Sequence, residues 1–253
     1  MITTKKNRWF AFIPNLLTLL NLSCGTVALY FAFHNYIDVA IVLMLAGAFF
    51  DFTDGLVARI LKVTGELGKQ LDSLADLVTF GILPGVMIFS TQKNILFEWV
   101  GNYEQFTVLH WIILFSALLI PVLSALRLAK FNIDTRQTDS FIGLPTPANA
   151  LFFASVVWTI ANSQSSFALL IGNPFVLGVI TLIFSLLLIS EIPLFALKFK
   201  TLKAKENLFR YLFLLISLVV LISLKIPGVA LIVLLYMVLS LIENAFRIRK
   251  TLK

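Results

Sequence analysis

Charged residues are scarce in this sequence. They make up 13% of its 253 residues, whereas a soluble domain usually carries about 25%. Apolar residues make up 59% of the chain, and its mean hydropathy is +0.96. One protein core could not bury so much apolar surface, so the sequence predicts an integral membrane protein.

Cysteine and histidine are also rare, which narrows the possible chemistry. The single cysteine, Cys24, excludes an internal disulfide framework. The two histidines, His34 and His110, fall at the predicted outer ends of their helices, and we interpret them as polar residues of the membrane interface. Neither is placed to act as a general base beside the carboxylates described below.

Long apolar runs predict the fold. A helix needs about 20 mostly apolar residues to cross the hydrocarbon core, and the sequence divides into eight such runs, the last two separated by a turn signal at 225–228. The runs cover about 10–33, 37–58, 70–91, 108–129, 147–162, 175–197, 208–224 and 227–246. We therefore expect an all-α polytopic bundle of about eight transmembrane helices, forming a single membrane domain over residues 1–253.

The basic residues predict the orientation of this bundle. If the N-terminus is cytoplasmic, 18 of the 20 Lys and Arg residues fall on the cytoplasmic side, and only Lys93 and Lys225 fall outside. This distribution places both termini in the cytoplasm and the net charge of +7 on one face. Attraction to anionic lipid headgroups explains that face, and nucleic acid is not an expected partner.

Four aspartates form the most informative pattern. Asp51 and Asp54 are three residues apart near the end of the second run, and Asp72 and Asp76 are four apart near the start of the third. Each pair shares one helix face, and the connection between the two runs is short. Both pairs can therefore converge at the cytoplasmic end of the bundle.

Electrostatics favours a metal site over a purely structural role for the four aspartates. Each ionised Asp within a span costs roughly 2.5–3.5 kcal/mol, and four facing carboxylates repel one another. Two hard divalent cations, Mg²⁺ or Mn²⁺, would cancel these charges and clamp a phosphoryl group. The alternative is that the aspartates cap helices or pair with Arg59, Lys62 and Lys69.

Residues beside the aspartates suit phosphate binding. Gly55 and Gly68 allow the backbone to approach a phosphate closely, and Arg59 can meet phosphate oxygens with its planar guanidinium. At the start of the first run, Asn15 and Thr18 follow Pro14 and present polar groups on one helix face. Alone, this start is typical of helix capping and packing.

The full pattern, Asp-x2-Asp-Gly-x2-Ala-Arg-x8-Gly-x3-Asp-x3-Asp, resembles the signature of the CDP-alcohol phosphatidyltransferase family, with every fixed position present. The resemblance implies two divalent cations at the carboxylates, a bound CDP group, and transfer of a phosphatidyl group to an alcohol with release of CMP. It also implies that the enzyme is a homodimer and that Asp76 is the general base. The implied metal ligands are Asp51, Asp54, Asp72 and Asp76, and the implied CDP-binding residues are Asn15, Thr18, Asp54, Gly55, Arg59 and Gly68.

Two further segments bear on the acceptor alcohol. Arg127 and Lys130 lie on one face at the end of the fourth run, and Thr146 is the expected N-cap of the next helix, with Pro147 at its first position. A helix N-terminus beside two cations would favour a substrate carboxylate. Positive-inside residues followed by an ordinary helix start explain the same pattern.

These segments resemble the phosphatidylserine synthase branch of the family, although Lys130 stands where Arg is commoner. The resemblance covers about residues 10–150, the expected catalytic core, and the helices of 175–246 are additional spans predicted from hydropathy alone. It implies that CDP-diacylglycerol and L-serine react at the cytoplasmic face of the cell (inner) membrane to give phosphatidylserine and CMP. The predicted serine-binding residues are Arg127, Lys130, Asn132 and Thr146.

Other functions remain open at the level of sequence. A sister enzyme of the same family could use choline, inositol or glycerol phosphate as the acceptor. More distantly, acidic residues in membrane spans also mark the ion pathways of divalent-cation transporters.

Overall fold

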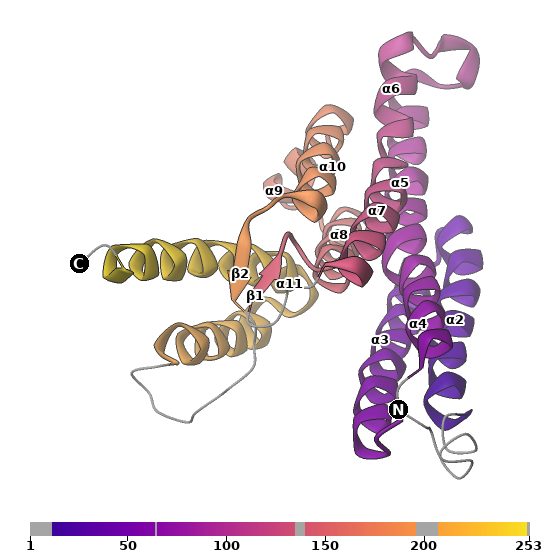
Figure 1. Ribbon diagram of the computed structural model, residues 1–253. Helices are drawn as coiled ribbons and strands as arrows, with labels where there is room; N and C mark the ends of the chain where they lie inside the picture. Colours follow the sequence, from indigo (N-terminus) through magenta and orange to yellow (C-terminus); the bar gives the residue numbers. More distant parts are fainter. Residues whose placement is uncertain (1–11, 64, 135–139, 196–206, 252–253) are drawn as a thin grey trace.

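The computed structural model describes residues 12–63, 65–134, 140–195 and 207–251 (Figure 1). The N-terminal half consists of α2 (Phe12–Phe33), α3 (Ile37–Ile60), and a continuous helical rod made of α4 (Glu66–Asp76), η1 (Leu77–Ile82) and α5 (Leu83–Val100). The short η2 (Tyr103–Gln105) leads into α6 (Val108–Ser116) and α7 (Leu119–Ile133). In Figure 1, α2, α3, α5 and α7 run along a common direction.

The C-terminal half is more varied. It contains β1 (Ser140–Ile142), α8 (Thr146–Asn162), α9 (Ser166–Ile171), α10 (Pro174–Ile189), β2 (Pro193–Phe195) and α11 (Leu208–Thr251). The described part of the chain contains five helices long and apolar enough to cross a membrane, and α10 is a shorter apolar helix. The five are Phe12–Phe33, Ile37–Ile60, Glu66–Val100, Val108–Ile133 and Leu208–Ala245. The prediction of a predominantly helical membrane protein is therefore confirmed.

Helix α11 combines the last two predicted runs. Its backbone breaks at Lys225 (φ 53°, ψ −131°), two residues before Pro227, whose missing N–H and fixed φ disfavour a continuous helix. We call residues 208–224 the first arm and residues 226–251 the second arm. Arg210 and Glu243 form an ion pair at 3.6 Å between the arms, so the arms are antiparallel. Figure 1 shows both arms running across the direction of α2, α3 and α5.

Two strands of three residues each form a short antiparallel ribbon beside the helices. The predicted run 175–197 is too long, because α10 ends at Ile189 and Pro193–Phe195 pairs with Ser140–Ile142. Pro193 explains the change, since the residue before a proline is disfavoured in the helical conformation. One face of the second arm then binds the strand: the Tyr236 hydroxyl donates to the Phe195 carbonyl at 2.9 Å, and Asn244 donates to the Pro193 carbonyl.

Gly143 allows the chain to pass close to the end of α10. It has φ +75°, and a Cβ atom there would lie 2.6 Å from the Leu188 carbonyl oxygen. Its own N–H donates to the Ile192 carbonyl at 2.9 Å, and the next amide, of Leu144, donates to the Leu187 carbonyl at 2.9 Å. Only glycine combines this conformation with this approach, and the contact fixes the start of α8 against α10.

Candidate active site

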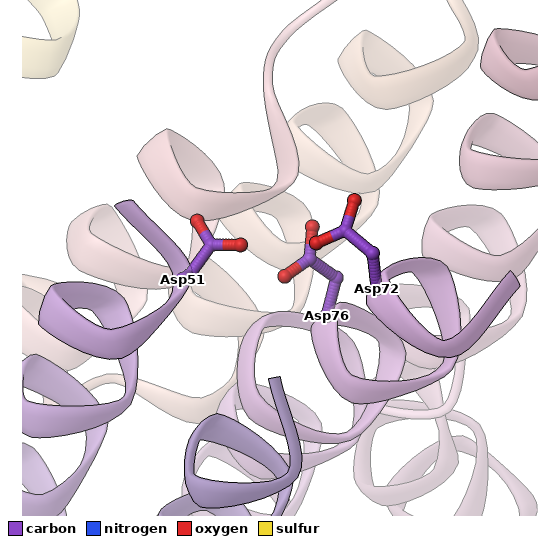
Figure 2. A group of neighbouring side chains, drawn as sticks. All are labelled: Asp51, Asp72 and Asp76. Atoms are coloured by element: carbon purple, nitrogen blue, oxygen red, sulfur yellow. The ribbon is translucent and has the colours of Figure 1, made fainter. Parts of the chain in front are cut away.

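Three carboxylates converge between α3 and α4. Asp51 comes from α3, and Asp72 and Asp76 come from consecutive turns of α4. One oxygen of each carboxylate lies within 4.8 Å of the others, and Figure 2 shows the three side chains directed into a shared space. The sequence prediction that the two helices bring their aspartates together is confirmed for these three residues.

Asp54 lies outside this group of three. Three residues along an α-helix correspond to about 300° of rotation, so the Asp54 side chain is turned by about 60° from that of Asp51. It is 6% exposed, and its carboxylate accepts a hydrogen bond from the Thr18 hydroxyl of α2. Its charge still interacts with that of Asp72. The predicted cluster of four is therefore a group of three with a fourth carboxylate beside it.

Asn21 contacts the site directly, and sequence reasoning did not select it. Its side chain is fully buried, its Nδ2 donates to Asp76 Oδ1 at 3.4 Å, and its Oδ1 has no partner among the described residues. The sequence feature that could have identified Asn21 is its position three residues after Thr18, which places both side chains on one face of an otherwise apolar helix. A buried amide is costly without partners, so this position has a specific role.

The helix changes type directly after Asp76. Residues Leu77–Ile82 form the π-helix η1, a rare conformation that occurs often at functional sites. The Thr79 hydroxyl of η1 donates to the Asn21 carbonyl at 3.2 Å. A Cβ atom at Gly25 would lie 2.3 Å from Thr79 Oγ1, and one at Gly47 would lie 2.9 Å from Asn21 Oδ1. The two glycines therefore allow α2, α3 and η1 to pack tightly around Asn21, the residue that donates a hydrogen bond to Asp76.

The predicted CDP-binding residues lie around the same helix ends. A Cβ atom at Gly68 would lie 3.1 Å from Asn15 Oδ1, so α4 and α2 approach closely there. A Cβ atom at Gly55 would meet nothing within 4 Å, so the backbone of α3 is open to a ligand at this point. The exposed Arg59 donates from Nε to the Gly55 carbonyl at 2.9 Å. Thr18 completes the set through its bond to Asp54.

Arg127 is the buried cation of the site. It is 8% exposed, its Nη1 donates to Thr146 Oγ1 at 3.3 Å, and its Nε has no partner among the described residues. Its charge interacts with that of Asp76. Arg127 and Lys130 both line a pocket of about 380 Å³, which agrees with their predicted position on one helix face.

The other two predicted acceptor residues have different contacts from those expected. Thr146 is not the N-cap: α8 begins at Thr146 after Pro145, and the Thr146 hydroxyl accepts the bond from Arg127 instead. Asn132 does not line the pocket. Its Nδ2 donates to Ser73 Oγ at 2.8 Å, and its carbonyl accepts from Lys69 Nζ at 2.5 Å. Asn132 therefore ties the end of α7 to α4, one turn from the carboxylates.

Comparisons with known proteins agree with this geometry. The model of the CDP-alcohol phosphatidyltransferase family matches residues 11–190. The CDP-diacylglycerol–serine O-phosphatidyltransferase of Bacillus subtilis is 35% identical over 72% of this chain and 88% of its own length. The archaetidylserine synthase of Methanothermobacter thermautotrophicus is 32% identical over 66% of this chain and 67% of its own. The CDP-diacylglycerol–serine O-phosphatidyltransferase of Mycobacterium leprae is 35% identical over 55% of this chain and 44% of its own.

Proposed function

Since this chain belongs to the CDP-alcohol phosphatidyltransferase family, we propose that it transfers the phosphatidyl group of CDP-diacylglycerol to the hydroxyl of L-serine. The products are phosphatidylserine and CMP. The observation that carries the proposal is the convergence of Asp51, Asp72 and Asp76 within electrostatic range of the buried Arg127. The relatives from Bacillus subtilis and Mycobacterium leprae are CDP-diacylglycerol–serine O-phosphatidyltransferases, which supports serine as the acceptor.

The cluster of three aspartates, Asp51, Asp72 and Asp76, suits the binding of two divalent cations, Mg²⁺ or Mn²⁺. All its donor atoms are carboxylate oxygens, which hard cations prefer, and none of the three aspartates forms an ion pair with a Lys or Arg of the described residues. Asp51, Asp72 and Asp76 would hold the ions, with Asp54 as the proposed fourth ligand. When bound, the ions neutralise the pyrophosphate of CDP-diacylglycerol and polarise the phosphorus that carries the lipid.

The residues around the carboxylates bind the CDP group. Asn15 and Thr18 approach it from α2, and Gly55 and Gly68 leave the backbones of α3 and α4 accessible to phosphate oxygens. Arg59 lies beside Gly55 and contributes a guanidinium that suits phosphate. Asp54, which Thr18 holds in place, completes this set.

Asp76 is the general base. It removes the proton of the serine hydroxyl, the hydroxyl oxygen forms a bond to the phosphorus of the phosphatidyl group, and the bond from that phosphorus to CMP breaks. A base must lie within hydrogen-bond reach of the proton that it takes. Asn21, itself fully buried, orients one oxygen of Asp76.

Arg127 binds the serine carboxylate, and Lys130 assists from the mouth of the pocket. Thr146 orients the Arg127 guanidinium through their hydrogen bond. Asn132 places the end of α7 against α4 through Ser73, so that the acceptor pocket and the general base keep a constant separation. Residues 10–150 thus form the catalytic core, and the helices of 175–246 complete the single membrane domain around it.

Release of CMP by the purified protein tests the function. CDP-diacylglycerol would be supplied with serine, inositol, choline or glycerol phosphate, each with Mg²⁺, with Mn²⁺ and with a chelator. We expect CMP release that requires both serine and a divalent cation. Release that depends on inositol, choline or glycerol phosphate and not on serine would overturn the acceptor assignment while leaving the family assignment intact.

Substitution of Arg127 tests the acceptor contact separately. Arg127→Ala should raise the KM for serine by about ten-fold or more, because a hydrogen-bonded charge pair contributes about 1.5–3 kcal/mol. The KM for CDP-diacylglycerol should change little. An unchanged serine KM would remove Arg127 from the acceptor site.

The proposed membrane topology places the active site at the cytoplasmic face of the cell (inner) membrane. Both termini are cytoplasmic and eight helices span the membrane, which requires the arms of α11 to align more closely with the bundle than in Figure 1. Because Cys24 is the only cysteine, single cysteines introduced into a Cys24→Ser chain report accessibility cleanly. Labels at positions 93 and 225 should react from outside, and a label at 62 should react only from inside.

A homodimer is proposed from the family resemblance alone. Cross-linking of the purified protein in detergent at increasing dilution measures the oligomeric state. A persistent band of twice the chain's mass is expected.

A further inference from the structure

The pocket at the end of α7 has walls of opposite charge. Arg127 and Lys130 line it from α7, Ile142 from β1, and Ser190 and Glu191 from the end of α10. Its volume of about 380 Å³ exceeds what an acceptor as small as an amino acid occupies. The α7 side of the pocket thus carries the cations Arg127 and Lys130, and the segment after α10 carries the Glu191 carboxylate.

These charges do not neutralise one another. Within the described part of the chain, Arg127, Lys130 and Glu191 form no ion pair with each other, and the buried Nε of Arg127 has no partner at all. A buried donor without a partner is costly, and of the three residues this applies to Arg127, since Lys130 and Glu191 are exposed. A ligand that carries an anion and a cation on neighbouring atoms would satisfy both walls at once.

The position of Glu191 is set by the fold. The Ser190 hydroxyl before it donates to the Leu187 carbonyl at 2.8 Å. The Ile192 carbonyl after it accepts from the Gly143 amide at 2.9 Å. Both neighbours of Glu191 are thus anchored, one to α10 and the other to the turn that Gly143 makes possible.

We propose that Glu191 binds the ammonium group of the acceptor, so that this pocket selects a zwitterionic α-amino acid. The inference rests on the proposed serine transfer and assigns to it a specificity residue outside the aspartate pattern. Arg127 and Lys130 hold the carboxylate, Glu191 holds the ammonium group, and the hydroxyl is left to point toward Asp76. Asp134 also lines the pocket but has interactions of its own, so Glu191 is the residue assigned.

This arrangement accounts for discrimination among acceptors. Glycerol phosphate lacks the ammonium group and choline lacks the carboxylate, so each leaves one wall of the pocket unsatisfied, and the uncharged inositol leaves both. A site built to bind a polar group rejects analogues that lack it, because its own polar groups are then left without that partner. Serine satisfies both walls.

The test compares Glu191→Gln with Glu98→Gln. The second is a matched change at an exposed glutamate near the C-terminal end of α5. CMP release would be measured over a range of serine concentrations, at saturating CDP-diacylglycerol and cation. Glu191→Gln should raise the serine KM about ten-fold, the effect of losing one charge-assisted hydrogen bond. The KM for CDP-diacylglycerol should stay unchanged, and Glu98→Gln should behave as the parent protein does.

A second ligand identifies the group that Glu191 contacts. 3-Hydroxypropionate has the carboxylate and hydroxyl of serine without the ammonium group, and its inhibition constant against serine can be measured in every variant. The parent protein should bind it about ten-fold more weakly than serine, and Glu191→Gln should leave its inhibition constant unchanged. The inference would be overturned if Glu191→Gln weakened the binding of serine and of 3-hydroxypropionate equally, or if it left the serine KM unchanged.

The two proposals fail differently. A parent protein that releases no CMP in response to serine refutes the serine transfer itself. A parent protein that uses serine, together with a Glu191→Gln variant of unchanged serine KM, refutes only the role of Glu191. Inhibition by zwitterionic lipid vesicles that Glu191→Gln abolishes would assign the pocket to a lipid headgroup and would also overturn the inference.

Discussion

Replacing Asp76 with Asn should abolish catalysis and yet stabilise the protein when no divalent cation is present. Asp76 belongs to two of the three carboxylate pairs, whose oxygens lie within 4.8 Å of one another. Asn has nearly the same shape, and its amide group can still accept the hydrogen bond from Asn21. The substitution therefore removes the charge and leaves the packing almost unchanged.

The magnitude follows from Coulomb's law. At an effective dielectric constant of about 20, two unit charges 4.8 Å apart repel by about 3.5 kcal/mol. Mobile counter-ions, water and proton uptake by the carboxylates themselves relieve a large share of this repulsion. A net gain of about 1–2 kcal/mol is therefore expected, given that two such pairs are relieved. For a chain of this size, that gain raises the apparent Tm by about 2–8 °C.

The assay is thermal unfolding of the detergent-solubilised protein in a chelator and in Mg²⁺ or Mn²⁺, combined with CMP release. In chelator, Asp76→Asn should melt at a higher temperature than the parent protein. Added cation should raise the Tm of the parent strongly and that of Asp76→Asn much less, because binding to the folded state alone stabilises it. The kcat should fall by at least about 10²-fold, the contribution of a general base.

The control is Glu104→Gln, which removes a negative charge at an exposed position of η2. It should change neither the Tm in chelator nor the response to cation. The reasoning would be refuted if Asp76→Asn melted below the parent in chelator while the cation stabilised both proteins equally. That result would mean that the carboxylates neither repel one another nor share an ion.

Three further substitutions test the supports of the site. Gly143→Ala places a Cβ atom 2.6 Å from a carbonyl oxygen of α10 at φ +75°; it should cost at least about 2 kcal/mol and lower the apparent Tm, measured by thermal unfolding. Asn21→Ala should lower kcat about ten-fold, with little change in either KM, because it removes a hydrogen bond to the charged Asp76; a change in KM alone would contradict this positioning role. Thr18→Val should raise the KM for CDP-diacylglycerol about five-fold and leave the serine KM unchanged, since it releases Asp54.

The sequence was sufficient to predict the helices and the three converging carboxylates, because both depend on local properties. Apolar runs of spanning length require helices, since a lipid-exposed backbone must satisfy its own hydrogen bonds. The spacing of Asp72 and Asp76 on one helix face follows from the helical repeat. The close approach that requires a glycine at position 143 was not apparent from the sequence, because it joins Gly143 to the end of α10.

The tertiary structure decided which side chains meet. Asp54 turned toward Thr18 and away from the other three carboxylates because a three-residue step does not complete a helical turn. Thr146 bonded to Arg127 and does not cap α8.

The ribbon formed by β1 and β2 pairs segments about 50 residues apart in the sequence, and the second arm of α11 satisfies its edge. Glu191, two residues before β2, lines the same pocket as Arg127. Hydropathy along the chain carries no information on such contacts, because they depend on the relative orientation of elements that are distant in sequence.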